Sequence, residues 1–225
     1  MKLIHARIRG WTATFRLPLI YSGNGLSSPL PPYSTLLGLL GALAGREIRH
    51  DETSIGFVFR SNGTGVDRES LKRLKIDNAG RLGIQPKPNT RSQHFHVHPQ
   101  LDLYLDNTDF RSCLEHPCSP PCLGRSQDVA WIETVREVEA EQVTQGAIRG
   151  TLVPFPQIGA SGQILVLPDY FHNDKTGYTR TIGKLNRYLA VKWSTPSEVE
   201  GVREGELMNV PATNETIYLH RLRQV

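Results

Sequence analysis

One stretch of the chain, residues 30–45, has the composition of a helix that begins at an anion-binding site. It reads LPPYSTLLGLLGALAG, so two prolines end the preceding segment, and leucines and alanines then recur with a helical period. We expect a helix of about eleven residues here, capped by Ser34 or Thr35 and stopped by Gly45. The free N–H groups and the positive dipole end of such a helix would suit a phosphate.

The same stretch places Gly38, Gly41 and Gly45 on one helix face. Each interior glycine costs about 1 kcal/mol of helix stability relative to alanine, so a structural reason for keeping them is expected. We interpret all three as positions of close packing, against a sheet or a neighbouring subunit. The entrance to the helix, residues 31–35, is then the part expected to face a ligand.

A second stretch, residues 122–131, reads CLGRSQDVAW and offers a tight turn followed by several hydrogen-bond donors. Gly124 permits backbone conformations that other residues avoid, and the three residues after it, Arg125, Ser126 and Gln127, can donate to a phosphate or to a base edge. The alternative is a structural turn in which Ser126 and Asp128 bond to their own backbone. The residues alone leave both interpretations open.

Residues 78–101 contain no acidic side chain and are rich in basic side chains and imidazoles. His94, His96 and His98 alternate along an expected strand and would share one face of it, with Phe95 and Val97 packed on the other. Such a face suits RNA, which is bound through positive charge and flat side chains. Two further interpretations stay open: paired imidazoles can chelate a metal, and a histidine near a lysine and a tyrosine can cleave RNA by acid–base catalysis. No set of such residues has a spacing that fixes a shared site.

Three cysteines, Cys113, Cys118 and Cys122, lie close together with His116 between them. Their odd number argues against a secreted disulfide framework. The group could supply four zinc ligands, but it lacks the paired C-x-x-C spacing that makes a zinc site convincing. We therefore expect reduced, unconnected cysteines, with no metal and no cofactor; the sequence does not decide whether the cluster binds metal.

The chain has 225 residues, of which 38% are hydrophobic, enough for one large domain or two small ones. Its longest apolar run, residues 36–44, is far shorter than the roughly 20 residues of a membrane span. The N-terminus starts with a strand-like segment in place of a signal peptide, so we expect a cytoplasmic location and no membrane. The formal net charge of +4 favours a polyanionic partner.

Short strands are the elements expected to hold these residues. Alternating apolar positions or β-branched runs predict strands at residues 2–9, 55–60, 94–98, 101–105, 129–138, 150–153, 163–167, 189–193 and 216–222. The segments 94–98 and 101–105 are expected to pair as a projecting hairpin.

Two helical segments are expected besides the first. Residues 67–75 have a weak helical period, and residues 109–115 can form a short helix capped by Asn107, Thr108 or Asp109. Helices placed between short strands in this order predict an α+β fold with a βαββαβ arrangement.

Three segments together resemble a known family. They are ATFR at residues 13–16, PPYSTLLGLLG at residues 31–41 and LGRSQD at residues 123–128. In this order they are similar to the motifs of the fifth CRISPR-associated protein family, the RAMP subunit of type I Cascade surveillance complexes. The resemblance spans roughly residues 2–195, and the Gly-Arg-Ser-Gln-Asp version is most like the type I-B branch.

The resemblance implies a fold and a set of partners. The fold is a ferredoxin-like (RRM-type) βαββαβ domain over residues 1–142, with a protruding β-hairpin thumb at about 81–106, and a smaller C-terminal β-rich region over residues 143–225. The implied partners are the 5′ handle of the guide RNA (crRNA), the seventh-family backbone subunits and the large subunit. Target DNA near the PAM is a further candidate partner.

The resemblance also implies the residues that would contact RNA. Carried onto this chain they are Arg16, Tyr33, Ser34, Thr35, Arg91, His94, His96, Gly124, Arg125, Ser126 and Gln127. The expected role is a non-catalytic subunit that recognises and caps the handle. One branch of the family, in type I-C, is itself a guide-processing ribonuclease, so metal-independent cleavage of precursor crRNA is the first alternative. A protein-interaction subunit with little RNA contact is the second.

Overall fold

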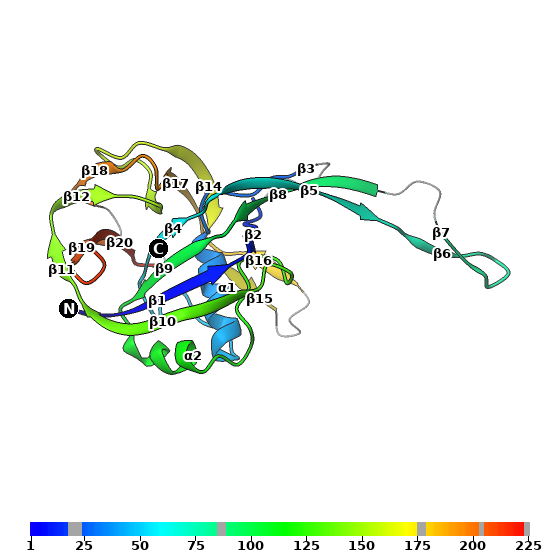
Figure 1. Cartoon of the computed structure of the whole chain (residues 1–225), viewed down its shortest axis with the longest axis horizontal. Coiled ribbons are helices and arrows are strands. Elements are labelled where there is room, and N and C mark those ends of the chain that lie inside the picture. Colours follow the sequence, from blue (N-terminus) through cyan, green and yellow to red (C-terminus); the bar gives the residue numbers. More distant parts are fainter. Residues whose placement is uncertain (18–23, 85–88, 175–178, 203–204, 223–225) are drawn as a thin grey trace.

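The centre of the molecule is a curled, seven-stranded antiparallel sheet with the spatial order β10-β1-β9-β4-β20-β19-β11 (Figure 1). The computed structural model describes residues 1–17, 24–84, 89–174, 179–202 and 205–222. In chain order the strands of this sheet are β1 (Lys2–Gly10), β4 (Ile55–Arg60), β9 (Gln100–Leu105), β10 (Ala130–Glu139), β11 (Glu141–Val143), β19 (Gly205–Val210) and β20 (Glu215–His220). The sheet has few helices around it, so the fold is mostly β with a small helical part.

Alternation along β1 gives the sheet its two faces. Ile4, Ala6 and Ile8 pack into the core beneath α1 (Tyr33–Ala44), while Leu3 belongs to a second apolar cluster on the opposite face. The chain enters the sheet as β1, returns through α1 to β4, turns to β9 and reaches β10 after α2 (Arg111–Glu115). This order puts β1 and β9 in the middle of the first four strands.

The helix α1 begins and ends close to where the sequence predicted. Leu36, Leu40 and Leu43 are completely buried on its sheet-facing side. Gly45 adopts the left-handed conformation, with φ 67°, and its N–H donates to the Gly41 carbonyl, so the predicted stop is confirmed. The predicted cap is wrong, because Pro32 occupies the cap position and no side chain caps the helix.

The glycines of α1 do not all serve close packing. A Cβ at Gly41 would lie 3.0 Å from the Arg46 carbonyl oxygen, and one at Gly45 would lie 3.0 Å from Cys118 Sγ, so both positions are tight. At Gly38, in contrast, a Cβ would meet no atom within 4 Å. The packing interpretation is therefore wrong for Gly38, which lies on the open side of the helix.

A long hairpin projects from the body and is drawn in teal and green on the right of Figure 1. Its stem pairs β5 (Gly63–Leu71) with β8 (Asn89–Val97), and its tip pairs β6 (Leu74–Ile76) with β7 (Leu82–Ile84). Two short strands, β2 (Thr12–Ala13) and β3 (Asn24–Gly25), join β8 at the base.

The structure corrects the expected hairpin at 81–106. Strand β8 pairs with β5, while β9 pairs with β1 and β4 inside the central sheet, so segments 94–98 and 101–105 do not pair with each other. The helix expected at 67–75 is also wrong, since residues 67–71 belong to β5 and residues 74–75 belong to β6. Leu71 and Leu74 gave a helical spacing, but pairing with a strand some twenty residues later decides the conformation.

The last third of the chain forms smaller sheets beside the central one. They are β13-β17-β14, made of Thr151–Pro154, Leu185–Val191 and Gln163–Pro168; β12-β18, made of Gln145–Ile148 and Ser197–Glu200; and β15-β16, made of Phe171–Asn173 and Arg180–Ile182. Because β11 pairs with β19 and β20 pairs with β4, the central sheet continues across the boundary expected between residues 142 and 143.

A short helical segment between β9 and β10 was predicted correctly. A 3-10 turn, η1 (Thr108–Phe110), leads into α2, and the Asn107 side chain accepts a hydrogen bond from the Asp109 N–H. Within the described residues, no helix combines the length and the apolar character that crossing a membrane requires.

Candidate functional site

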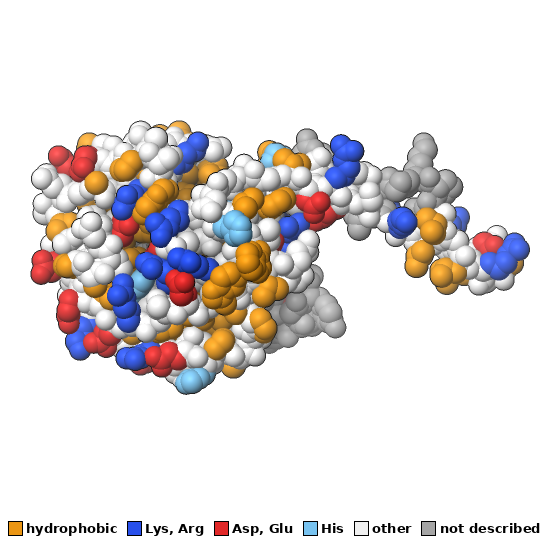
Figure 2. All heavy atoms as spheres, viewed as in Figure 1, with side chains coloured by type: hydrophobic (Ala, Val, Ile, Leu, Met, Phe, Trp, Pro, Cys, Tyr) orange, Lys and Arg blue, Asp and Glu red, His pale blue; other side chains and the backbone are white. Residues whose placement is uncertain are grey.

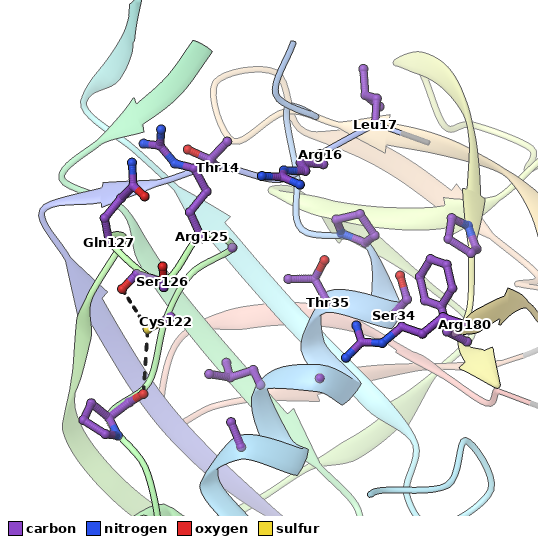
Figure 3. A pocket seen from close by; sticks show the side chains of 18 of the residues that line it. Thr14, Arg16, Leu17, Ser34, Thr35, Cys122, Arg125, Ser126, Gln127 and Arg180 are labelled. Carbon is purple, nitrogen blue, oxygen red and sulfur yellow. Dashed lines mark hydrogen bonds between the residues drawn. The ribbon is translucent and has the colours of Figure 1, made fainter. Parts of the chain in front are cut away.

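A cleft of about 730 Å³ lies between the start of α1 and the loop of residues 122–128 (Figure 3). The residues that line it come from distant parts of the chain: Thr14, Arg16, Leu17, Pro32, Ser34, Thr35, Gly38, Leu39, Ala42, Glu69, Arg91, Pro120, Cys122, Gly124, Arg125, Ser126, Gln127, Pro168, Phe171 and Arg180. Both stretches singled out in the sequence therefore meet at one place. Of the eleven predicted site residues, eight line this cleft.

The loop of residues 122–128 is held against the segment after β2 by its backbone. The Thr14 N–H donates to the Leu123 carbonyl at 2.9 Å, and the Leu123 N–H donates to the Asp128 carbonyl at 2.9 Å. Gly124 has φ 116°, and a Cβ there would lie 1.8 Å from the Thr14 carbonyl oxygen. Only glycine allows this close approach, so Gly124 fixes the shape of the loop.

Arg125 is a structural residue of the loop. Its Nε and Nη2 donate to the two Asp128 carboxylate oxygens at 3.0 and 3.1 Å, and its Nη1 donates to Glu69 Oε1 at 2.8 Å. The Arg125 side chain is 8% exposed and that of Asp128 is 0% exposed. These contacts raise the pKa of Arg125, the Asp128 hydrogen bond first. Arg125 therefore lies at the cleft with its charge already compensated, and its predicted RNA contact stays a prediction.

Glu69 joins the hairpin to the same loop. Its Oε2 accepts from Arg91 Nε and Nη2 at 3.0 and 2.8 Å, while its Oε1 accepts from Arg125. The hydrogen bond from Arg91 is the main cause of the lowered pKa of Glu69, and burial acts against it. Arg91, predicted to contact RNA as part of the thumb, lines the cleft and is paired with Glu69. No sequence pattern predicted that Glu69 would lie at the cleft.

Ser126 and Gln127 form the exposed turn of the loop and point toward the cleft from its opposite side to α1 (Figure 3). Cys122 Sγ lies 3.6 Å from the Ser126 carbonyl oxygen and so supports this turn from behind. The hydroxyl and amide groups remain available as donors and acceptors at the cleft surface.

The first turn of α1 faces the cleft from the other side. Ser34 and Thr35 are partly exposed there, and no acidic residue lies in this turn. Pro32 leaves the helix without a side-chain cap, although the Thr35 and Leu36 N–H groups both donate to the Pro32 carbonyl, at 2.9 and 3.2 Å. The positive end of the helix dipole therefore faces the cleft without a capping side chain. Ser34 and Thr35 lie at the cleft, where the sequence predicted a ligand-facing entrance to the helix. Neither side chain caps the helix, so the predicted capping role is wrong.

Two exposed arginines lie on either side of this turn, as Figure 3 shows. Arg16 lies two residues after the backbone contact of Thr14, and Arg180 begins β16. In the described part of the chain neither guanidinium has an ion-pair partner. Arg180 was missed by the sequence reasoning. The excess of basic residues between positions 145 and 195 was the only signal for it, and that excess does not say which arginine reaches the cleft.

Tyr33 does not face the cleft. It is completely buried, and its hydroxyl donates to the Leu152 carbonyl at 2.9 Å. Its ring packs against His220 at 4.4 Å between centroids. Burial raises the pKa of Tyr33 well above its usual value. The predicted RNA contact at Tyr33 is corrected: the ring anchors the start of α1 to the C-terminal strands.

His96 is also a core residue. It is 4% exposed, its Nε2 lies 2.8 Å from the Ser28 carbonyl oxygen, and its ring packs on Phe15 and Phe59. Burial lowers the pKa of His96. His94 is half-buried on the hairpin stem and does not line the cleft. The expected histidine face is therefore wrong, because its middle member points inward.

The cysteines do not converge. Cys113 Sγ lies 3.2 Å from the Phe110 carbonyl oxygen, and Cys122 Sγ contacts the loop described above. Cys118 packs on Gly45. Within the residues that the structure describes, no group of three or more histidine, cysteine or acidic side chains could hold a metal ion.

Comparison with known proteins identifies the family. A sequence profile of the family described as CRISPR-associated protein (Cas_Cas5) matches residues 3–181 of the 225, a span that includes both motifs of the cleft. The chain belongs to this family. The recognition made from the motifs is thereby confirmed. A search of curated proteins found no match.

Solved structures share the fold of this family member at low sequence identity. A chain of a CRISPR RNA-guided surveillance complex has a TM-score of 0.60 and 18% identity, covering 88% of this chain and 91% of that chain. A CRISPR protein from Archaeoglobus fulgidus has a TM-score of 0.52 and 10% identity, with coverage of 98% and 100%. A chain of the type III-B Cmr-beta complex bound to cognate target RNA has a TM-score of 0.51 and 12% identity, covering 89% of this chain and 86% of that chain.

Proposed function

We propose that this chain is a non-catalytic subunit of a type I CRISPR effector complex, of the I-B kind, and that it holds the 5′ handle of the guide RNA in the cleft. The observation that carries the proposal is the meeting of the two motifs, because the start of α1 and the loop of residues 122–128 line one cavity. Membership of the Cas_Cas5 family and the fold shared with a chain of an RNA-guided surveillance complex support it.

The chemistry of the cleft supports binding of a single RNA strand. Arg16 and Arg180, which have no carboxylate partner among the described residues, offer cations for phosphates. Ser34, Thr35 and the turn at 126–127 offer groups for sugar and base edges. Glu69 is the only acid among the described lining residues, and two arginines neutralise it. Guanidinium groups stay protonated at neutral pH, so this set favours holding RNA over proton transfer.

The proposal includes an architecture and partners. The chain order β1, α1, β4, β9, α2, β10, with spatial order β10-β1-β9-β4, fits a ferredoxin-like βαββαβ core, and the hairpin of residues 63–97 fits the thumb. We assign the seventh-family backbone subunits and the large subunit as protein partners, target DNA near the PAM as a further one, and the cytoplasm as location.

Fluorescence anisotropy with a labelled strand carrying the handle sequence tests the proposal. The double variant Arg16→Gln/Arg180→Gln is expected to bind at least about tenfold more weakly, since each charge-assisted contact contributes about 1.5–3 kcal/mol. The slope of log affinity against log salt should fall by about 1.4, because each phosphate contact to a single strand contributes about 0.7. Arg111→Gln on α2, an exposed arginine paired with Glu115, is the matched control. Unchanged binding of the double variant would favour the interaction-only alternative.

A cleavage assay addresses the ribonuclease alternative. The purified chain, incubated with labelled precursor repeat RNA without metal, is expected to leave the RNA intact. His94→Ala is the informative variant, because substitution of the buried His96 would damage the fold instead. Cleavage at one site that disappears in the His94→Ala protein would replace the proposed role with an enzymatic one.

A further inference from the structure

The face of the central sheet opposite α1 carries a row of polar and aromatic side chains. Trp131, Arg9, Gln100 and Arg60 come from the four neighbouring strands β10, β1, β9 and β4 and are cross-strand partners in register. Arg9 Nη2 and Arg60 Nη2 both donate to Gln100 Oε1, at 3.2 and 2.9 Å. The row therefore runs across three strand spacings, about 14 Å. Figure 2 shows basic and hydrophobic side chains side by side on the face where β1 and β10 lie in front.

Exposed aromatic rings stand at one end of this row. Trp11 is 66% exposed and Trp131 is 41% exposed, and their ring centroids are 5.7 Å apart at 57°. The turn that contains His98 supports Trp11. The His98 N–H donates to the Trp11 carbonyl at 2.9 Å, and the His98 ring contacts the indole edge-on, with 5.5 Å between ring centroids. His98 has φ 45°, a conformation that few non-glycine residues adopt. A strained turn thus presents a large apolar ring to solvent.

The third tryptophan lies at the other end. Arg60 and Arg149 stack over the Trp193 ring at 5.0 and 3.8 Å from its centroid. All three tryptophans of the chain therefore lie along this face. The described residues that line the cleft include no tryptophan.

Positive charge exceeds negative charge along the face. Its arginines are Arg7, Arg9, Arg60, Arg136 and Arg149, and the carboxylates paired with them are Asp102, Glu133 and Glu215. Arg60 and Arg136 have no carboxylate partner in the described part of the chain. A row of arginines with two exposed indoles at one end matches what binds single strands: cations for the phosphates and rings on which bases stack.

We propose that this face is a second nucleic-acid-binding surface, separate from the cleft, which takes a single-stranded segment with its bases on Trp11 and Trp131 and its phosphates on Arg9 and Arg60. The class of ligand is an unpaired RNA or DNA strand, since stacking and phosphate pairing are common to both. The surface lies on the other side of the sheet from α1, so it does not depend on the role proposed for the cleft.

Intrinsic tryptophan fluorescence of the full chain tests this directly, because every indole lies on the face. Titration with an oligo(U) strand and with an oligo(dT) strand of equal length is expected to quench the emission and to distinguish RNA from DNA by affinity. Trp11→Ala should weaken binding about tenfold, within the range for loss of one stacked base. Arg60→Gln should reduce the salt slope by about one. The exposed Ile158→Ala and Arg111→Gln serve as matched controls that should change nothing.

The outcomes separate the two sites. Quenching that persists in Arg16→Gln/Arg180→Gln and is lost in Trp11→Ala supports the proposal, even if handle binding by the cleft fails its own test. Absence of quenching by both strands overturns it, as does quenching lost equally in the cleft variant. A blue shift of the emission only on assembly with protein subunits, without an effect of oligonucleotides, would also overturn it and make the face a protein interface.

Discussion

The arginines of the cleft differ in what already neutralises them. Arg125 is enclosed by Asp128 and Glu69, whereas Arg16 and Arg180 face solvent without a carboxylate among the described residues. Carboxylates already take three of the five N–H donors of Arg125, so a phosphate would gain less there than at a guanidinium with no carboxylate partner. We therefore expect Arg16 and Arg180 to contact the phosphates of the proposed ligand, while Arg125 holds the shape of the loop.

Asp102 is, like Asp128, a buried carboxylate with a structural role. It accepts hydrogen bonds from His5, Arg7 and Gln100, each at 2.8 Å. Burial alone would raise the pKa of Asp102, but these donors outweigh it and lower the pKa to about 2. The carboxylate thus ties β1 to β9 in the middle of the sheet.

Asp102→Asn is expected to lower the free energy of unfolding at pH 7 by about 2 kcal/mol. Because the folded pKa lies below the unfolded one, the stabilisation is present above about pH 4 and is lost as the pH falls toward 2. Urea denaturation at neutral and acid pH measures this, with Glu137→Gln, an exposed partner of Lys2, as control. Equal losses in the Asp102→Asn protein at both pH values would contradict the assignment.

At the scale of elements, local signals were sufficient for some segments and insufficient for others. Strand β1, helix α1 with its glycine stop, and the Asn107 turn were predictable because neighbouring residues decide them. The partner of β8 was not, because the nearest strand-like segment, β9, is taken by the central sheet. The inward direction of Tyr33 and His96 was equally hidden, since residue type does not say which side chain finds a buried acceptor.

Gly38 provides a test of the cleft through α1. Gly38→Ala should stabilise the protein by up to about 1 kcal/mol, because a Cβ there meets nothing and alanine favours the helix. Gly38→Leu should keep the fold but weaken handle binding, since its side chain would fill the cleft. Thermal unfolding and anisotropy report the two effects separately. Gly41→Leu, beside the Arg46 carbonyl, should instead destabilise the fold. Full RNA binding by the Gly38→Leu protein would argue against the cleft.

Glu69 connects the hairpin stem to the loop of residues 122–128. Glu69→Gln removes the charge shared by Arg91 and Arg125, and we expect a loss of about 1–3 kcal/mol at this junction. Hydrogen exchange followed by mass spectrometry should show faster exchange in the loop and in the stem, with the rest unchanged. Glu115→Gln on α2, which removes an exposed pair, is the control. No change in the loop would mean that Asp128 alone holds Arg125.

At the scale of the whole molecule, the projecting hairpin ends in an apolar tip. Its exposed aliphatic side chains pair across the strands on one face: Leu74 with Ile84 and Ile76 with Leu82, each between 62% and 67% exposed. Such a patch contributes little to the isolated chain, and exposed apolar patches commonly mark contacts with other molecules.

Replacing all four tip residues by threonine is therefore expected to leave the stability of the body within about 0.5 kcal/mol. Incorporation into a complex with the proposed backbone subunits should fall. Scanning calorimetry of the free chain and co-purification of the complex measure these two results. A clear drop in melting temperature would show that the tip supports the fold itself.

The pairing of β20 with β4 has a consequence for synthesis. Strand β4, residues 55–60, gains one neighbour, β9, within some forty residues of further synthesis. Its other neighbour, β20, follows β4 only after some 155 further residues have been translated. Until then one edge of the sheet stays open, and an open edge can pair with another nascent chain. Completion of the central sheet is thus tied to synthesis of β20, so a chain that ends before β20 should be an aggregation-prone product rather than a smaller working domain.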